Sequence, residues 1–379
     1  MAKQFYRFLS HIQEGGLRRD IARISCTHRK NVDNWIKCQL PRLPRLASEI
    51  PRFPTPHNWM WLPISTKGKS FTNWIKVPFR VKYHDAVRYV LSQISSVETK
   101  QMRDWTRSFG KISKSNALGY VLGVICSDGY FQRKSVVERV ALNLSKTYDW
   151  SKNFGDGFCY CLGRIGINAH QIADSISLYE WDDSIRESYT MNWISESSPI
   201  LNWIKRSCLG FQLKGSKSNI DAEWIIDAPK DFRICFIQGV SDGDGTVTSM
   251  LAEISTTSEG EFYSRVLDSL GFSTKFSDSR VLIHRVEDIP KAAHLPLFKF
   301  ASGRQKKLNH LSRMTQVSSE AGYMSESEKE LIQSLIKQDY GRSEIRFKIW
   351  EELRISRSEV AIWRFKKSLD DSQNPEQND

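Results

Sequence analysis

Residues 118–129 read LGYVLGVICSDG, and residues 235–245 read CFIQGVSDGDG. Each stretch has two small residues four positions apart, then an apolar run, then an Asp-Gly pair that contains Asp128 or Asp244. Residues at i and i+4 share one face of a helix. Each stretch therefore predicts a helix with a face on which a second backbone can lie close. The small residues of this helix interface are Gly119 and Gly123 in the first stretch and Cys235 and Gly239 in the second.

The Asp-Gly pairs predict where the two helices end. Gly129 follows Asp128, and Gly245 follows Asp244. A glycine after a helix is typical of the position where the chain turns through a left-handed conformation. We therefore expect each Asp on the last turn of its helix and a left-handed glycine after it.

Packing of the small-residue faces would bring the two carboxyl-terminal helix ends together. Asp128 and Asp244 would then lie near the free carbonyl groups of Ser127 and Gly243, which makes the pocket electronegative. Oxygen ligands with open water positions suit Mg²⁺ (or Mn²⁺), and divalent ions between carboxylates commonly serve phosphodiester cleavage. Asp128, Asp244, Ser127 and Gly243 are thus the candidate metal ligands.

The two stretches resemble the paired LAGLIDADG motifs of homing endonucleases, in the single-chain form with two motifs. The resemblance covers roughly residues 116–310. In that family the eighth motif residue is the metal-binding carboxylate, which Asp128 and Asp244 match. The sixth residue is Cys126 in the first copy and Asp242 in the second, a position that is not catalytic in the family. The resemblance implies a monomeric, metal-dependent endonuclease that cleaves double-stranded DNA at specific sites.

The order of expected elements is the same after both motifs: two strands, a helix, two strands and a helix. This pattern predicts an α+β fold of duplicated αββαββα half-domains, residues 116–220 and 221–315, which the resemblance arranges as a pseudo-two-fold saddle. The expected strands are 130–134, 136–144, 176–181 and 186–194 in the first half, and 246–251, 253–257, 272–276 and 280–285 in the second.

Polar residues on these strands are candidates for contacts to base edges, because the resemblance implies that each sheet lies in the major groove. The candidates are Gln132, Arg133, Asn143, Arg186, Thr248, Ser255, Lys275 and Arg280. Basic residues near the carboxylates would stabilise charge on the phosphate. Lys146 and Lys306 are the candidates for this catalytic role.

The charge of the chain is concentrated before the first motif. The 379 residues carry a net charge of +12. Residues 1–115 contain 22 Lys and Arg against 7 Asp and Glu, a net +15, whereas the remaining residues contain 33 against 36, a net −3. This imbalance indicates a polyanionic partner for the leading segment. The seven cysteines form no regular framework and no long apolar run occurs, so we expect a reduced, cytoplasmic, nucleoid-associated protein with no membrane partner.

Residues 1–38 resemble a helix-turn-helix. Ala22, Cys26 and Val32 have the spacing of its small, turn and aliphatic positions, with Cys26 where glycine is usual. Arg29, Lys30 and Asn31 would then begin the helix offered to the major groove. Residues 39–115 predict a proline-rich basic linker, in which Arg42 and Arg45 could follow a phosphate backbone, and a small α/β segment.

Residues 322–370 resemble a second helix-turn-helix, with helices at 326–338, 343–353 and 357–367. Residues 355–360, ISRSEV, resemble its turn and the start of its recognition helix. Two other functions stay open at this point. The flanking segments also suit a DNA-binding transcriptional regulator without catalysis, and LAGLIDADG proteins are similar in fold to maturases, which would make intron RNA the partner.

Overall fold

The computed structural model describes residues 4, 7–8, 18–36, 59–64, 73–78, 81–93, 95–134, 137–181, 184–210, 220–256, 258–316 and 323–373. It combines helices with antiparallel sheets, which confirms the mixed class expected from the sequence. The chain forms two compact units, residues 1–243 and 244–379. Within the described ranges, no helix has the length and apolarity needed to cross a membrane.

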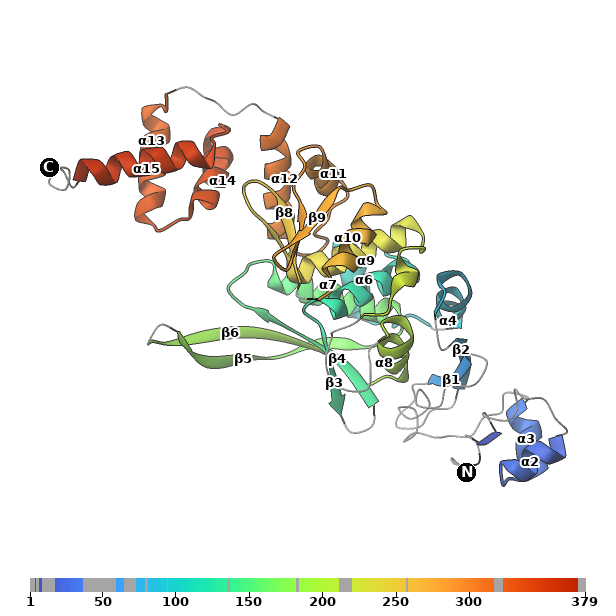
Figure 1. The fold of residues 1–379 in the computed structure, drawn as a ribbon. Helices are drawn as coiled ribbons and strands as arrows, with labels where there is room; N and C mark the ends of the chain where they lie inside the picture. The colour runs from blue at the N-terminus through green and yellow to red at the C-terminus, as the bar shows by residue number, and fades with distance from the viewer. Residues whose placement is uncertain are drawn as a thin grey trace. The chain divides into compact units, whose positions relative to one another are not determined.

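The first unit is built on a four-stranded antiparallel sheet in the order β3-β4-β6-β5 (Figure 1). Its strands are β3 (Tyr130–Lys134), β4 (Val137–Ser145), β5 (Ala169–Trp181) and β6 (Ser184–Ser195). Val140, Leu142 and Leu144 alternate along β4 and are buried, because side chains on a strand point alternately to the two faces of the sheet. Helix α7 (Ser151–Arg164) packs against this buried face.

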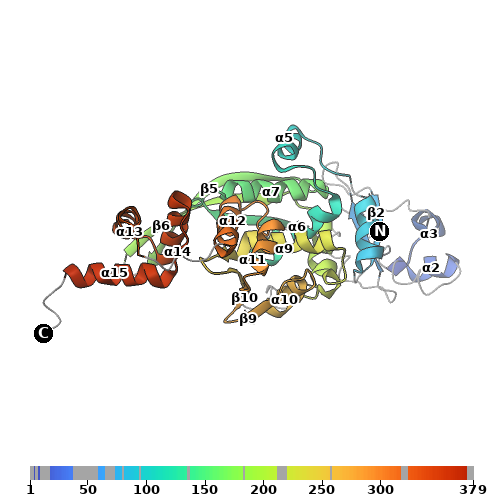
Figure 2. The ribbon, with the colours of Figure 1, turned by 90° about the horizontal axis from the view of Figure 1, so that it is seen from above.

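Two central helices carry the glycine-containing stretches: α6 (Lys114–Cys126) and α9 (Lys230–Asp244). Ser113 caps α6 by accepting a hydrogen bond of 3.1 Å from the backbone of Asn116. Residues 117–126 of α6 are all buried, as expected for a helix that is apolar around its whole circumference. Figure 2 shows α6 and α9 beside each other and next to α7.

Helix α5 (Lys100–Phe109) is an element that the sequence pattern did not predict. It lies along the outer side of α7 (Figure 2). Met102 and Trp105 of α5 are buried, and a methyl group on Gly163 of α7 would collide with the Met102 side chain. The hydroxyl of Tyr160 donates a hydrogen bond of 2.9 Å to the Gly110 carbonyl. Helix α5 is therefore packed onto this unit through one face, which carries Met102 and Trp105.

Shorter elements complete the first unit. Before α5 they are α2 (Arg18–Ile24), α3 (Arg29–Ile36), β1 (Trp59–Ile64), β2 (Asn73–Pro78), the π-helix η2 (Tyr83–Val87) and α4 (Arg88–Gln93). After β6 they are α8 (Pro199–Trp203), the π-helix η3 (Ile204–Cys208) and the 3₁₀-helix η4 (Glu223–Ile225). Strands β1 and β2 pair antiparallel.

The second unit also contains a four-stranded antiparallel sheet, in the order β7-β8-β10-β9. Its strands are β7 (Gly245–Val247), β8 (Ala252–Ser255), β9 (Thr274–Ser277) and β10 (Arg280–Ile283). Its helices are α10 (Gly260–Asp268), α11 (Asp288–His294) and α12 (Ser302–Gln316). The strand orders of the two sheets correspond position by position.

Three further helices close the second unit: α13 (Glu326–Lys337), α14 (Arg342–Leu353) and α15 (Glu359–Gln373). They enclose a small apolar core of Ile332, Leu335, Ile345, Ile349 and Ile362.

Two expected strand boundaries differ from the structure by four residues or more. The strand expected to reach residue 251 ends at Val247, because the Thr248 hydroxyl accepts hydrogen bonds from the backbones of Met250 and Leu251 and closes a turn. The strand expected to begin at residue 176 begins at Ala169, since it keeps pairing with β6 past an irregularity between Ile172 and Ser175. The first sheet therefore has a much longer hairpin than the second.

Candidate functional site

The glycine faces of α6 and α9 pack directly on each other. A methyl group added at Gly119 would lie 2.8 Å from the Phe232 carbonyl oxygen, and one added at Gly123 would lie 2.8 Å from the Val240 backbone nitrogen. The reverse contact is equally close, because a methyl group at Gly239 would lie 2.9 Å from the Val124 nitrogen. Carbon atoms essentially never approach backbone atoms at such distances, so any side chain at these positions would force the helices apart. Cys235, the fourth predicted interface residue, is buried.

A buried hydrogen bond crosses the same interface. The Tyr120 hydroxyl on α6 donates to Asp242 Oδ2 on α9 at 2.7 Å. Both residues are fully buried. Burial, followed by the nearby Asp242 carboxylate, raises the pKa of Tyr120 well above its ordinary value of 10.0. The phenol therefore stays protonated and remains a hydrogen-bond donor. The sequence pattern assigned no role to this pair, although both residues lie within the two motif-bearing stretches.

The carboxyl-terminal end of α9 lies against the segment that follows α6. A methyl group on Gly243 would collide with the Ser127 side chain and lie 3.1 Å from the backbone nitrogen of Asp128. The single proton of the Ser127 hydroxyl has three carbonyl acceptors within reach: those of Gly123 and Val124 at 3.2 Å and that of Gly239 at 3.4 Å. Ser127 and Gly243 are thus adjacent, as the proposed pocket requires.

The left-handed conformation expected for the glycine after each Asp was wrong. Neither Gly129 nor Gly245 has a positive φ. Gly129 is needed for a different reason: its backbone N–H donates a hydrogen bond of 2.7 Å to the Val124 carbonyl, and an added methyl group would lie 2.8 Å from that same oxygen. The chain after α6 therefore folds back tightly against the helix end.

The two candidate metal-binding carboxylates lie at different positions relative to the ends of their helices, so the expectation that each Asp lies on the last helical turn holds for Asp244 and was wrong for Asp128. Asp128 lies two residues beyond Cys126, the last residue of α6, and is exposed. Asp244 is the last residue of α9 and is half-buried. The carboxyl-terminal end of a helix carries a partial negative charge, so each carboxylate adds to a field that favours a cation. Among the described residues, no group of three or more His, Cys, Asp or Glu could hold a metal ion.

The two candidate catalytic lysines form ion pairs with carboxylates. Lys146 Nζ lies 3.0 Å from Asp174 Oδ2. Lys306 on α12 pairs with Glu351 on α14. Both lysine side chains are more than half exposed, at 55% and 63%. Surface pairs of this kind contribute little to stability, so either ammonium group could exchange its partner for a phosphate at low cost.

Predicted base-reading residues of the first sheet form a polar cluster. Gln132 and Asn143 donate hydrogen bonds of 2.9 and 3.0 Å to the Tyr130 hydroxyl. Arg139 donates one of 3.1 Å to the Gln132 side chain. The register pairs Gln132 with Arg139, so these side chains share the face opposite the buried Val140 and Leu142. Tyr130 and Arg139 were not among the candidates, and the alternation of β3 and β4 would have identified them.

The second sheet has a matching polar face. Ser255, Lys275 and Arg280 are exposed, and their pairing register places them opposite the buried side of the sheet, which contains Val281 and Ile283. Arg280 lies 3.5 Å from Glu253 on the same face. Thr248 instead closes the β7–β8 turn.

Among the remaining predicted DNA-binding residues, the structure describes the side chains of Arg29, Lys30 and Asn31. Arg29 and Lys30 are exposed at the start of α3, and the Asn31 amide donates a hydrogen bond of 3.0 Å to the Thr27 hydroxyl. Cys26 has φ +50°, the left-handed turn that glycine usually supplies. Arg42 and Arg45, and the side chains of Arg133 and Arg186, lie outside the described part of the structure.

Comparisons with known proteins gave structural similarities only. No family model matches the chain, and no curated protein sequence matches it. The structure of I-DmoI in complex with DNA and Ca is 19% identical, covers 48% of this chain and 90% of its own, and has a TM-score of 0.33. A structure of mesophilic variants of the homing endonuclease I-DmoI is 20% identical in sequence, covers 48% of this chain and 96% of its own, and has a TM-score of 0.33. The homing endonuclease I-WcaI bound to its DNA recognition sequence is 11% identical, covers 56% of this chain and 93% of its own, and has a TM-score of 0.35.

Proposed function

We propose that this protein is a site-specific DNA endonuclease of the LAGLIDADG type, in which Asp128 and Asp244 hold a divalent metal ion. The observation that carries the proposal is the contact between the two helix ends. Gly243 packs on Ser127 and beside the Asp128 backbone, and Asp244 is the next residue along the chain.

The donor set fits a hard divalent cation. Asp128 and Asp244 supply carboxylates, and the carbonyl groups of Ser127 and Gly243 add neutral oxygen ligands, which together suit Mg²⁺ or Mn²⁺. When bound, such an ion lowers the pKa of water and stabilises charge on a phosphate. The glycine interface has the role of fixing the spacing of the helix ends. Lys146 and Lys306 would stabilise charge on the phosphate after leaving their carboxylate partners.

The sheets supply a DNA-binding surface under this proposal. Their strand orders correspond, and each sheet follows a helix with an Asp-Gly pair at its end, which supports duplicated αββαββα halves. The proposal adds that these halves form a saddle and act as a monomer. Each sheet has one face buried by helices and one face bearing polar side chains that would meet base edges. Gln132, Asn143, Lys275 and Arg280 are the described side chains best placed for this role. The basic leader, with Arg29 and Lys30 exposed, would add phosphate contacts.

The proposal is tested by incubating the full chain with a library of random-sequence duplex DNA and Mg²⁺ and sequencing the cut ends. We expect one sequence family to be cut, with no cutting by the double variant Asp128→Asn, Asp244→Asn. The selected DNA should still bind this variant, because each change keeps the side-chain shape. A wild-type protein that binds a sequence family without cutting it, in Mg²⁺ or Mn²⁺, would instead be a regulator.

A further inference from the structure

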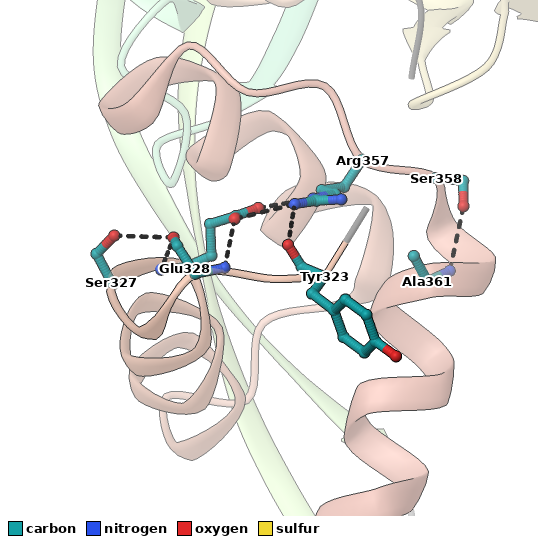
Figure 3. Close-up of polar contacts among 7 residues, drawn as sticks. Tyr323, Ser327, Glu328, Arg357, Ser358 and Ala361 are labelled. Atoms are coloured by element: carbon teal, nitrogen blue, oxygen red, sulfur yellow. Dashed lines mark hydrogen bonds and ion pairs between the residues drawn. The ribbon is translucent and has the colours of Figure 1, made fainter. Parts of the chain in front are cut away.

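The connection between α14 and α15 is held rigidly by a buried ion pair. Arg357 and Glu328 are each about 2% exposed. Arg357 Nε and Nη2 donate hydrogen bonds of 2.6 and 3.0 Å to the two Glu328 oxygens. Figure 3 shows that the same guanidinium also reaches the carbonyl oxygen of Tyr323, at 3.2 Å. Glu328 in turn belongs to the capping box with Ser325 at the start of α13.

This ion pair corrects the expected start of the recognition helix. The sequence pattern placed Arg357 at its beginning, but α15 starts at Glu359. Ser358 caps the helix by accepting a hydrogen bond of 3.1 Å from the Ala361 backbone. With its guanidinium buried against Glu328, Arg357 has a structural role and cannot reach an outside partner without unfolding the turn.

The outward face of α15 combines exposed apolar and basic side chains. Val360 is 55% exposed and Trp363 is 45% exposed, and Arg364 and Lys367 are exposed beside them. These residues follow the spacing i, i+3, i+4 and i+7 and therefore form one stripe. Ile362 belongs to the opposite face and is buried in the three-helix core. The stripe is thus not required by the packing of the domain.

The chemistry of this stripe favours a nucleic acid. No carboxylate of the described chain forms an ion pair with Arg364, Lys366 or Lys367, in contrast to Lys306 and Lys329 of the same unit. Lys367 Nζ lies 5.7 Å from the centre of the Trp363 ring, which keeps positive charge directly beside the exposed aromatic surface. An apolar docking partner would have to desolvate these charges, whereas phosphates would pair with them.

Contacts to the second sheet support a defined position for α15. Glu359, at its first turn, accepts a hydrogen bond from the hydroxyl of Ser249 in the β7–β8 turn. Ser249 is fully buried, and its backbone N–H donates a hydrogen bond of 2.9 Å to the Ser343 hydroxyl on α14. Arg346 of α14 donates to the Ser249 carbonyl. The stripe is therefore held rigidly relative to strands that carry predicted base-reading residues.

We infer that Val360, Trp363, Arg364 and Lys367 form a second DNA-recognition surface, which inserts α15 into the major groove beyond the base pairs read by the sheets. A single helix fits the width of that groove, and a rigid helix loses little conformational freedom on binding. This inference rests on the proposed function, because it takes duplex DNA as the partner. Under this inference the stripe contacts bases, whereas the Arg357–Glu328 pair has only the structural role of fixing the start of α15.

The test uses the full chain and the random-sequence duplex, in Ca²⁺-containing buffer for binding and in Mg²⁺ for cutting. Arg364→Gln with Lys367→Gln should flatten the dependence of log K on log salt by about 0.9 for each phosphate that the variant no longer neutralises. With Trp363→Ala, the selected DNA sequences should lose their base preference at a group of consecutive positions at one end of the recognition site. The preference at the centre, where cutting occurs, should stay as in the wild type.

The matched control is Lys337→Gln with Arg342→Gln, which removes one Lys and one Arg from exposed positions of the same three-helix domain. Circular dichroism spectra should be the same for all variants, because every altered side chain is exposed or half-exposed. If the α15 and control variants have equal salt slopes and select the same sequences, the inference is wrong. Stronger competition by single-stranded RNA than by duplex would also overturn it. A wild-type chain that cuts no DNA overturns the proposed function instead.

Discussion

Tyr120 and Asp242 join the two central helices through a buried 2.7 Å hydrogen bond that lies within one turn of the Asp-Gly end of α9. Glycine contacts set how closely the helices approach, but they are non-directional. A hydrogen bond between two buried polar groups has a preferred geometry and is costly to break. This bond therefore fixes the rotation and the register of one helix against the other.

Tyr120→Phe should destabilise the protein without leaving a large cavity. The hydrogen bond that this change removes has a carboxylate as its acceptor, and bonds to charged groups contribute about 1.5–3 kcal/mol. Tyr160→Phe is the matched control, because the Tyr160 hydroxyl donates to a neutral carbonyl, that of Gly110, and such bonds contribute about 1 kcal/mol. Urea unfolding curves measure both. A Tyr120 variant that is no less stable than the Tyr160 variant would remove the special role of this bond.

Even the smallest side chain should disrupt the helix interface. We expect Gly123→Ala and Gly239→Ala each to lower the free energy of unfolding by about 1–3 kcal/mol or more, because the added methyl group meets backbone atoms that cannot move aside. Gly341→Ala is the control, since no atom lies within 4 Å of a methyl group at that position; because Gly341 is the N-cap of α14, this change should cost at most about 1 kcal/mol, through the poorer cap alone. Thermal denaturation of the three variants separates the two cases, and equal melting temperatures would contradict the interface.

The basic leader should determine much of the salt dependence of DNA binding. Residues 1–58 contain 11 Lys and Arg against 4 Asp and Glu, and their removal leaves intact the segment with α5, which packs on α7. Each phosphate that the shortened chain no longer neutralises should reduce the slope of log K against log salt by about 0.9. In the full chain, Arg29→Gln with Lys30→Gln should produce part of that change. Titrations at several salt concentrations measure this, and unchanged slopes would show that the charge faces solvent.

The Arg357–Glu328 pair predicts a specific loss of stability in acid. The hydrogen bond from Arg357 lowers the pKa of Glu328 below its ordinary value of 4.5, although burial opposes this. A carboxyl with a lower pKa in the folded state stabilises the fold above its unfolded pKa, and this contribution is lost as pH falls through the folded pKa. We therefore expect the stability of the wild type to decline below about pH 4.5.

Glu328→Gln is the informative variant, because Gln can still take part in the capping box but cannot titrate. Between neutral pH and acid its stability should fall less than that of the wild type. Arg357→Ala should cost about 3–5 kcal/mol at neutral pH, since it leaves a buried carboxylate without its cation. Denaturant titrations at several pH values check both variants. Parallel pH profiles for wild type and Glu328→Gln would show that the pair does not control acid stability.

Local patterns were sufficient to predict much of the fold. The alternation of residues 130–144 and the turn signals between strands located β3 and β4 within one or two residues. The repeated small-residue spacing identified α6 and α9. Helix α5 was missed because its apolar residues are few and lie among charged ones, so its burial depends on α7, a partner distant in sequence.

The same limit applies to the candidate site. The hydrogen bond between Tyr120 and Asp242 joins residues 122 positions apart, and no local pattern predicts such a pairing. Gly129 was assigned the wrong reason for being glycine, because a close approach to the Val124 carbonyl and a left-handed turn leave the same mark on the sequence. Arg357 was misread likewise, since an exposed and a buried arginine look identical before Glu328 is placed beside it.

The hairpins of the two sheets differ greatly in length. Strands β5 and β6 have 13 and 12 residues, whereas β9 and β10 have 4 each. At about 3.3 Å per residue, the longer strand extends about 40 Å and the shorter about 13 Å. If the protein cleaves DNA as proposed, this difference in strand length predicts an asymmetric recognition sequence. Its two half-sites would be read over different numbers of base pairs, so the recognised sequence would not be an inverted repeat, and the protein would bind it in one orientation only.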